Sequence, residues 1–251
     1  MQKGFEATYH SVEANHWWFI SRRALVKEMV LRAQPNREAA ILEIGCSGGL
    51  LLEDLQECDY TKLTGIDISE DAVKLCRERK LGDMRVMDAQ RPEFPPGSFD
   101  VIIASDILEH LSDAPLSLRA WHKLLRPEGV LIIFVPAFMF LWSDHDVVNQ
   151  HFHRYQAGEM VELLKSSGFD VRQKGYWNFT LFPPVMIVRL AKRLLFLKRG
   201  VSPSGDLKEL PRWLNSLLTS LLFLENRLIT SGINFPWGVS VIALAKKHSG
   251  A

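Results

Sequence analysis

Residues 43–49 combine a carboxylate with a glycine-rich turn, and this stretch indicates the chemistry of the protein most directly. Glu43 precedes Gly45 by two positions, and the turn continues through small residues to Gly49. The apolar run at 40–44 predicts a strand before the turn, and the pattern from Leu50 predicts a helix after it. Glycines in such a turn permit positive φ and let a ligand approach the backbone without meeting a Cβ. The turn therefore suits a cofactor that contains adenosine.

Two cofactors compete for a turn of this kind. A dinucleotide site has three glycines spaced G-x-G-x-x-G, with the pyrophosphate on the N-terminus of the helix. Here the third glycine is missing, and Glu43 lies directly before the turn. A carboxylate repels a pyrophosphate but attracts the ammonium group of an amino acid. The residues therefore favour S-adenosyl-L-methionine over NAD.

Histidines supply the second set of candidate groups. His110 follows a buried apolar run, while His145, His151 and His153 lie in one short segment that also contains two aspartates. An oxygen nucleophile of high pKa needs a general base, which is most often histidine. We predict that His110, His145 or His151 has this role. The His/Asp segment could also hold a divalent metal, but such groups more often form local hydrogen bonds, and we predict no metal site.

Composition limits the class of protein. The chain has 251 residues, of which 47% are hydrophobic, enough for one full core. Its net charge of +1 argues against a nucleic-acid binder held by bulk electrostatics. The three cysteines form no C-x-x-C pair, and no charged-then-apolar leader opens the sequence. We therefore expect a cytoplasmic protein without disulfides or cysteine-bound zinc.

Strands and helices alternate between residues 40 and 136, which is typical of a doubly wound α/β sheet. Beyond the first strand, further strands are predicted at 62–66, 84–87, 99–104 and 130–135. Asp67 ends the second of these strands, where a doubly wound fold places an acid on ribose hydroxyls. A carboxylate can accept both hydroxyls of one ribose. A helix cap is the alternative role for Asp67, and Ser69 suits that role better.

Three motifs resemble the class I S-adenosylmethionine-dependent methyltransferases. Residues 43–49 resemble their motif I, E/D-x-G-x-G-x-G, with Ser47 where the second glycine is expected. Residues 109–111, E-H-L, and 125–129, L-R-P-x-G, flank a predicted helix as in the family, and the E-H pair resembles that of ubiquinone-pathway O-methyltransferases and cyclopropane fatty acid synthases. The opening H-W-W-F-x-x-R-R at 16–23 is similar to that of a bacterial subgroup, which looks related to enzymes of cell-surface glycan assembly.

The resemblance implies an α/β fold with a doubly wound, seven-stranded, mostly parallel sheet, the Rossmann-like methyltransferase fold. It divides the chain into an N-terminal helical lid at 1–36, a cofactor-binding core at 37–178 and 236–247, and a helical insertion at 179–235 before the last strand. The alternative for the first segment is a helix that only packs its aromatic side chains on the sheet. The residues expected to bind S-adenosyl-L-methionine are Glu43, Gly45, Cys46, Ser47, Gly49, Asp67, Ile68, Asp88, Ala89, Ser105, Trp17 and Arg22.

The insertion is apolar and basic. Residues 179–235 contain eight Lys/Arg and three Asp/Glu. Two apolar helices are predicted at 184–197 and 211–229, and charged residues interrupt both, so no transmembrane pass is expected. The pattern suits helices lying on an anionic membrane surface, but it favours a helical hairpin that covers the active site or forms a dimer interface. The residues expected to meet lipid phosphates are Arg189, Lys192, Arg193, Lys198 and Arg199.

Three functions are compatible with these features. The first is methylation of a hydroxyl or carboxylate on a small molecule, a glycan or a lipid-linked acceptor. The second is an NAD-dependent oxidoreductase or epimerase, against which the chain has Glu43 and lacks a Tyr-x-x-x-Lys pair. The third is a non-catalytic binding module. We expect the first, in a monomer or homodimer that binds no nucleic acid, is cytoplasmic, and contacts the inner face of the membrane peripherally through the insertion.

Overall fold

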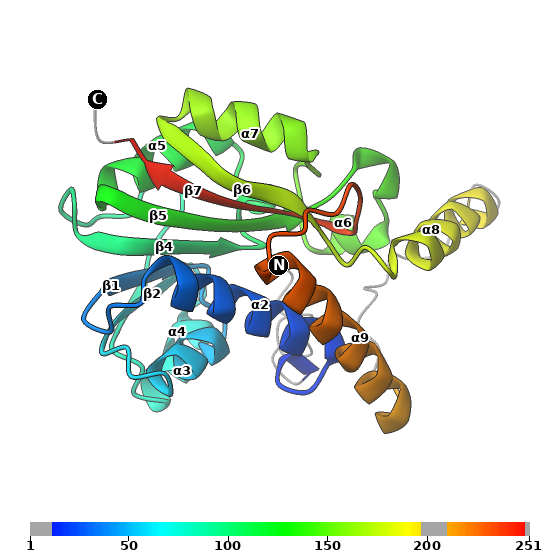
Figure 1. Ribbon diagram of the computed structural model, residues 1–251, viewed down its shortest axis with the longest axis horizontal. Coiled ribbons are helices and arrows are strands. Elements are labelled where there is room, and N and C mark those ends of the chain that lie inside the picture. Colours follow the sequence, from blue (N-terminus) through cyan, green and yellow to red (C-terminus); the bar gives the residue numbers. More distant parts are fainter. Residues whose placement is uncertain (1–11, 197–209, 249–251) are drawn as a thin grey trace.

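The computed structural model describes residues 12–196 and 210–248, except for the side chains of residues 192–196. Seven strands form one sheet in the order β3-β2-β1-β4-β5-β7-β6, in which β7 is antiparallel to both of its neighbours and the other pairs are parallel (Figure 1). This is the predicted doubly wound sheet. The strands are β1 Ala40–Ile44, β2 Lys62–Asp67, β3 Asp83–Val86, β4 Phe99–Ser105, β5 Leu125–Pro136, β6 Phe169–Trp177 and β7 Ser240–Lys247.

Helices cover both faces of the sheet. The helices of four turns or more are α2 Trp17–Ala33, α8 Phe182–Phe196 and α9 Arg212–Thr230. The shorter ones are α3 Leu50–Gln56, α4 Glu70–Glu78, α5 Ala114–Leu124, α6 Asp144–Val148 and α7 Ala157–Ser166, with single 3-10 turns η1 Leu108–His110 and η2 Met139–Leu141. Residues of α2, α3 and α9 pack in the core on one face, and residues of α5 and α7 pack on the other.

The alternation of side chains along β1 determines to which face of the sheet Glu43 points. Leu42 and Ile44 belong to the core under α5 and α7, whereas Ile41 belongs to the core under α2 and α3. Because side chains alternate along a strand, Glu43 lies on the same face as Ile41. The N-terminal helix therefore covers the face to which Glu43 points.

The structure corrects several predicted boundaries. A single helix over residues 5–34 is wrong within the described part, because a turn at residues 14–15 precedes α2, whose N-cap is His16. Residues 5–11 lie outside the described residues. Strand β5 begins at Leu125, five residues earlier than predicted, with Glu128 at a positive φ of 64°. Helix α6 was not predicted, since its five residues are too short for a periodic pattern.

The insertion stands between β6 and β7, as predicted. Helix α9 lies along α2 (Figure 1), and buried polar contacts fix it there. Asn226 accepts a hydrogen bond from Trp177 Nε1 at 2.9 Å and donates one to the carbonyl oxygen of Ser21 at 2.7 Å. The carboxylate of Glu225 accepts hydrogen bonds from the backbone N–H groups of Phe179 and Thr180. The helix is therefore part of the fold rather than an appendage.

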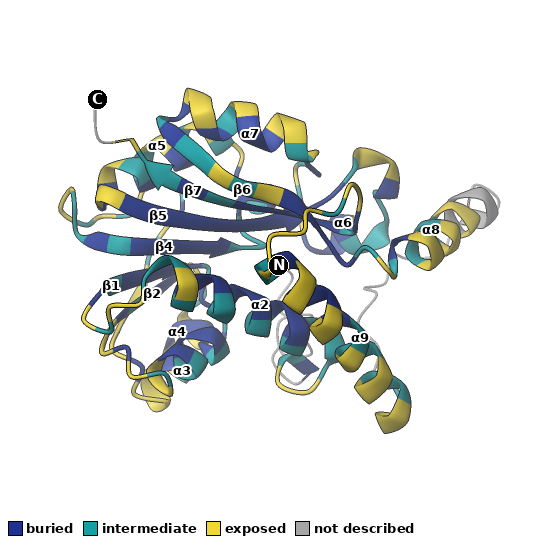
Figure 2. Ribbon diagram, viewed as in Figure 1, coloured by how far each residue is buried: buried dark blue, intermediate teal, exposed yellow. Residues whose placement is uncertain are grey.

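Helix α8 makes fewer contacts. It extends away from the sheet, and much of its described surface is exposed (Figure 2). Its contact with the body includes a hydrogen bond of 2.7 Å from Arg189 Nη1 to the carbonyl oxygen of Leu141 in η2. No helix in the described part of the chain is long and apolar enough to span a bilayer.

Candidate active site

The glycine turn has the backbone geometry that the sequence predicts. Gly45 and Gly49 have positive φ values of 74° and 80°. A Cβ on Gly49 would lie 2.6 Å from Leu81 Cδ1 and 2.8 Å from Cys76 Sγ, so this position requires glycine. Ser47 also has a positive φ of 48°, at the position where motif I has its second glycine. The positive φ explains why the motif prefers glycine at this position. Ser47 adopts the same φ at the cost of some backbone strain.

Asp67 is fixed at the end of β2, next to the turn. Its carboxylate accepts hydrogen bonds from the backbone N–H groups of Ser47 at 3.0 Å and Ser69 at 2.9 Å. Ser69 is the N-cap of α4, as expected, because its side chain accepts from Ala72 N at 3.2 Å. Ile68 is 75% exposed beside Asp67. An acid and an exposed apolar side chain together suit a ribose and the base attached to it.

Glu43 is buried with an unmet hydrogen-bonding capacity. It is 6% exposed, and its Oε2 atom has no hydrogen-bond partner among the described residues. Burial, and then the nearby Cys76 and Glu13, raise the pKa of Glu43 well above its ordinary value. A buried acceptor without a donor is costly. The amino-acid part of S-adenosyl-L-methionine carries an ammonium group that would satisfy it, so this residue fits the cofactor.

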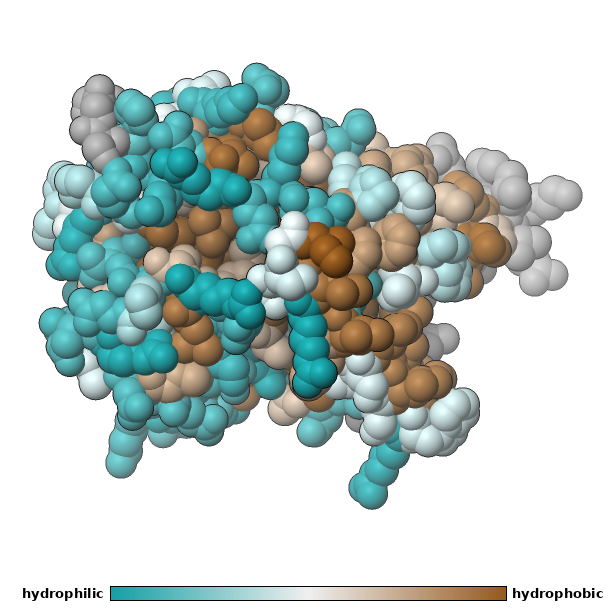
Figure 3. Space-filling model, viewed as in Figure 1, coloured by the Kyte–Doolittle hydropathy of each residue, from teal (hydrophilic) through white to brown (hydrophobic). Residues whose placement is uncertain are grey.

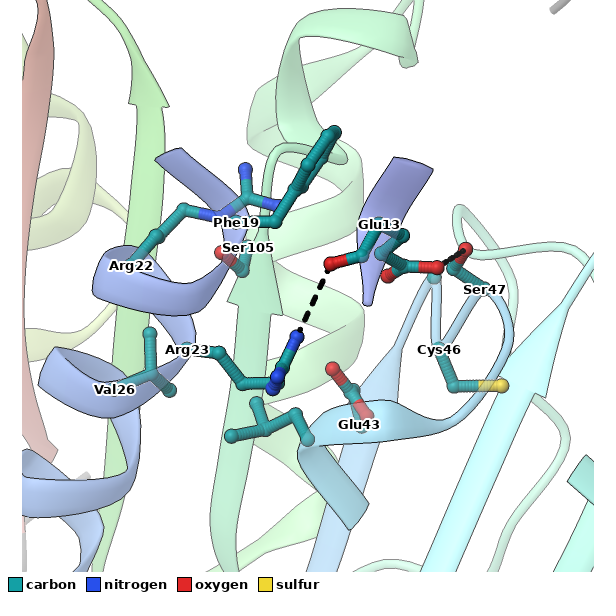
Figure 4. A pocket seen from close by; sticks show the side chains of 11 residues that line it. Glu13, Phe19, Arg22, Arg23, Val26, Glu43, Cys46, Ser47 and Ser105 are labelled. Carbon is teal, nitrogen blue, oxygen red and sulfur yellow. Dashed lines mark hydrogen bonds between the residues drawn. The ribbon is translucent and has the colours of Figure 1, made fainter. Parts of the chain in front are cut away.

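The segment before and within α2 closes over the turn (Figure 4). Ser47 Oγ donates a hydrogen bond to Glu13 Oε2 at 3.2 Å, and Arg23 Nη1 donates to the carbonyl oxygen of Glu13 at 3.5 Å. Arg22 forms an ion pair with Asp106, and its guanidinium lies 4.1 Å from the centre of the Trp18 ring. These contacts leave a small cavity between this N-terminal segment and the turn, lined by residues of both.

A larger cavity of about 600 Å³ adjoins this site. Part of its lining is aromatic and apolar, with side chains from α2, from Leu181 just before α8 and from the first turns of α8. Another part of the lining is polar and comes from the segments that follow β4 and β5. Arg22 and Phe19 line both cavities, so they form the wall between them. The apolar lining includes Trp17, Trp18, Leu181, Val185 and Val188, and the polar lining includes Glu109, His110, His145, His151 and Arg154.

A buried charged pair orients one histidine of the larger cavity. Asp146 is fully buried and accepts hydrogen bonds from Arg154 Nε at 2.7 Å and Arg154 Nη2 at 3.0 Å. His151 Nδ1 lies 2.8 Å from Asp146 Oδ1. Burial opposes ionisation of Asp146, but hydrogen bonds from His151 and the charge of Arg154 lower its pKa overall. Because the carboxylate holds Nδ1–H, Nε2 of His151 is the nitrogen that can accept a proton.

Glu109 and His110 complete the polar side. Glu109 is 1% exposed, and burial raises its pKa to about 8. Burial and the neighbouring His151 lower the pKa of His110 to about 3, so its ring is neutral near pH 7. The rings of His110 and His151 meet edge to face with centroids 4.6 Å apart. Single ligand atoms of Glu109, His110 and His151 lie within 4.8 Å of one another.

The family follows from the comparison of the chain with protein-family models. The model for the methyltransferase domain matches residues 9–174. The chain belongs to the class I S-adenosylmethionine-dependent methyltransferases. This assignment confirms the family predicted from motif I and the E-H-L segment.

Curated relatives agree with this assignment. The methyltransferase is 27% identical over 172 residues to a Mycolicibacterium smegmatis protein named "Probable S-adenosylmethionine-dependent methyltransferase", which covers 66% of this chain and 64% of the relative. It is 35% identical over 99 residues to the ubiquinone biosynthesis O-methyltransferase of Pseudomonas aeruginosa, covering 37% of this chain and 42% of the relative. The chain thus spans less than two thirds of the length of these curated relatives.

Solved structures show the same fold. Phosphoethanolamine N-methyltransferase 2 from Haemonchus contortus, solved with S-adenosyl-L-methionine, superposes with a TM-score of 0.57 at 18% identity, covering 87% of this chain and 51% of that one. At this identity the likeness concerns the fold alone. It supports the predicted sheet of the methyltransferase and its helices on both faces.

The structure brings together some of the predicted cofactor residues of the methyltransferase and separates others. Those that line the smaller cavity are Glu43, Gly45, Cys46, Ser47, Ser105 and Arg22. Asp88 is exposed after β3, where its carboxylate accepts from Gln90 N at 2.8 Å, and the carbonyl oxygen of Ala89 accepts from Trp121 Nε1 at 2.8 Å. Neither of these two residues lines a cavity described above.

Trp17 is placed differently from the prediction. It lines the larger cavity rather than the cofactor turn, and its backbone N–H donates to Asn215 Oδ1 at 2.8 Å. The physical reason is helical periodicity, because Phe19, Arg22 and Val26 share the face of α2 that meets the turn. Trp17, two positions before Phe19, lies off this face and lines only the larger cavity, which Phe19 and Arg22 also line.

The histidines also separate. His110, His145 and His151 all line the larger cavity. His153 instead lies 2.7 Å from Glu159 and is not part of the cavity lining. The possible metal group of His145, His151 and His153 is therefore not assembled. Glu13, Asp106 and Glu109 also line the two cavities, and sequence analysis did not assign them a role. The one signal available in the sequence was the position of Glu109 next to His110.

Proposed function

We propose that this protein transfers the methyl group of S-adenosyl-L-methionine to an oxygen atom of an acceptor bound in the larger cavity. The observation that carries the proposal is the Asp146–His151 pair in a largely apolar cavity beside the cofactor turn. Methyl transfer from a sulfonium is an in-line displacement with an activated leaving group. The protein therefore contributes mainly alignment of the acceptor oxygen, the methyl carbon and the sulfur.

His151 is the proposed general base. Its Nε2 takes the proton of the acceptor hydroxyl as the oxygen–carbon bond forms and the carbon–sulfur bond breaks, which leaves S-adenosylhomocysteine. Asp146 then faces an imidazolium, which its charge stabilises, as a carboxylate does behind a catalytic histidine in other enzymes. His110 is a weaker candidate than the sequence indicates, because a pKa of about 3 makes it a poor proton acceptor.

Each end of the cofactor has candidate partners. Glu43 would bind the ammonium group, Arg22 the carboxylate and Asp67 the ribose hydroxyls, with Asp88 near the adenine amino group. The buried and unpaired Oε2 of Glu43 supports the first of these roles. The position of Asp67 at the end of β2, and of Asp88 just after the neighbouring parallel strand β3, supports the last two roles.

The cavity favours an acceptor with an apolar body. The lining combines aromatic rings of α2 and aliphatic side chains of α8 with polar histidines, so it suits a hydroxyl on an otherwise apolar molecule. Among a small molecule, a glycan and a lipid-linked acceptor, this lining suits the lipid-linked acceptor. An oxidoreductase or a non-catalytic module has no support from the family assignment.

Tritium-labelled S-adenosyl-L-methionine tests the proposal. We would incubate the protein separately with the aqueous and the organic-solvent extract of cells of the source organism, and identify labelled products by mass spectrometry. We expect label in the organic fraction as an alkali-stable methyl ether, with loss of labelling in His151→Ala and retention in His153→Ala. Label on nitrogen or carbon, or equal labelling by both variants, would overturn O-methylation through His151.

A further inference from the structure

We propose that the outer faces of α8 and α9 form a docking surface for an anionic lipid bilayer. The docking face consists of large apolar side chains that are exposed although they belong to ordered helices. Its members are Ile187, Val188 and Leu190 of α8 and Trp213, Leu217, Phe223, Leu224 and Leu228 of α9. Brown, hydrophobic atoms gather over α9 and α8 in the space-filling view (Figure 3).

The apolar residues of α9 lie on two opposite faces. Leu222 and Ile229 are buried in the core against the sheet, on the side where Glu225 and Asn226 form their hydrogen bonds. Trp213, Leu217 and Leu224 are 70%, 58% and 56% exposed. A surface helix of a globular protein normally turns a polar face to water. The outer face of α9 therefore needs an apolar partner.

Charge identifies the kind of partner. The sequences of α8 and α9 contain one acidic residue, Glu225, which is 2% exposed and bonded to backbone N–H groups. The exposed charged residues of α9 are Arg212 and Arg227. A second copy of the chain would bring the same cations to this face and no exposed helical acid. An anionic bilayer offers phosphates to the arginines and acyl chains to the apolar residues.

The docking face adjoins the acceptor cavity. Val188 is 53% exposed and also lines the larger cavity, and Val185, one turn earlier on α8, lines it too. A hydroxylated lipid could thus pass from the bilayer to His151 along α8 without crossing bulk water. This last step rests on the proposed O-methylation, whereas binding of the bilayer does not.

Vesicle flotation tests the docking face. The purified protein would be mixed with vesicles of phosphatidylcholine alone or of equimolar phosphatidylcholine and phosphatidylglycerol, at low and high salt. We expect recovery with the anionic vesicles only, reduced at high salt because the ionic part is screened. Equal recovery in the unbound fraction with both kinds of vesicle would overturn the proposal.

Matched variants separate the two components of binding. The double variant Arg212→Gln with Arg227→Gln should lower the partition coefficient about 30-fold, because each arginine near the surface contributes roughly fivefold. Arg91→Gln with Arg119→Gln, two exposed arginines elsewhere, should leave it unchanged. Leu217→Asp with Leu224→Asp should abolish binding, whereas Val86→Asp, at a site 43% exposed, should not. Circular dichroism confirms that each variant is folded, and equal loss in control and docking variants would contradict the assignment.

The labelling assay separates this proposal from the proposed function. If the Leu217/Leu224 variant loses vesicle binding but methylates a detergent-dispersed acceptor at the wild-type rate, both proposals stand. If the wild type binds vesicles but methylates no acceptor, the proposed function is wrong and the docking face stands. If the wild type methylates the acceptor but binds no vesicles, only the docking face is wrong. If the wild type dimerises with rising concentration and the Leu217/Leu224 variant does not, the face belongs to a second copy of the chain.

Discussion

The cofactor region and the acceptor cavity lie side by side but are assembled from different elements. Glu43, Asp67 and Ser105 stand at or near the carboxyl ends of β1, β2 and β4, and the register of the parallel sheet sets their spacing. The acceptor cavity instead uses α2, α8 and the segments after β4 and β5. Its geometry depends on contacts between side chains far apart in sequence. The first region is therefore fixed by the fold class, and the second by features of this chain.

The two regions also differ in how their carboxylates are satisfied. Glu43 is buried, and its Oε2 atom has no hydrogen-bond partner among the described residues, so it can accept a donor from a ligand. Asp146 is fully paired with Arg154 and His151, so it orients a neighbour and does not bind a ligand itself. Substitutions in the two regions should consequently affect different measurable quantities.

The largest effect is expected in the acceptor cavity. His151→Ala removes the proposed base, and kcat should fall about 10²–10⁴-fold, measured with the acceptor identified by labelling. The control His153→Ala should keep kcat within a few-fold, because His153 lies outside the cavity and pairs with Glu159. A rate for His151→Ala close to wild type would move the base to His145 or show that the acceptor needs none.

The contact of α9 with the body should contribute to stability rather than to chemistry. Glu225→Ala leaves the N–H groups of Phe179 and Thr180 without their acceptor, at a cost of about 1–3 kcal/mol in the free energy of unfolding. Urea denaturation would measure it, with Glu162→Gln on the exposed face of α7 as the control. An unchanged unfolding free energy would mean that α9 does not depend on this contact.

The free energy of unfolding should depend on pH because of Glu109, the buried acid that lines the larger cavity. The pKa of Glu109 rises from 4.5 to about 8, so between these values the folded protein holds a proton that the unfolded chain has lost. Stability therefore falls as pH rises through this window, by at most about 1.4 kcal/mol per pH unit. Glu109→Gln lacks this decline, so its unfolding free energy relative to wild type should increase with pH across the window. A difference that stays constant with pH would show that Glu109 has an ordinary pKa.

The sequence predicted the backbone elements around the glycine turn because their signals are local. The glycine turn, the strand ends and Ser69 as a cap each depend on a few adjacent residues, and the structure has them as predicted. The contacts of α9 could not be predicted, because Asn226 and Ser21 are 205 residues apart. The pairing of Asp146 with His151 also escaped prediction. Several acids and bases lie in that segment, and only the fold decides which of them are buried together.

Calorimetric titration of S-adenosyl-L-methionine into wild type, Asp67→Ala and His151→Ala tests the separation of the two regions most directly. Asp67→Ala leaves buried polar groups unpaired, so we predict a loss of binding free energy of about 1–3 kcal/mol. His151→Ala should bind the cofactor as wild type does, because His151 lines only the larger of the two cavities. Equal losses in both variants, or wild-type affinity for NAD with none for S-adenosyl-L-methionine, would contradict the account.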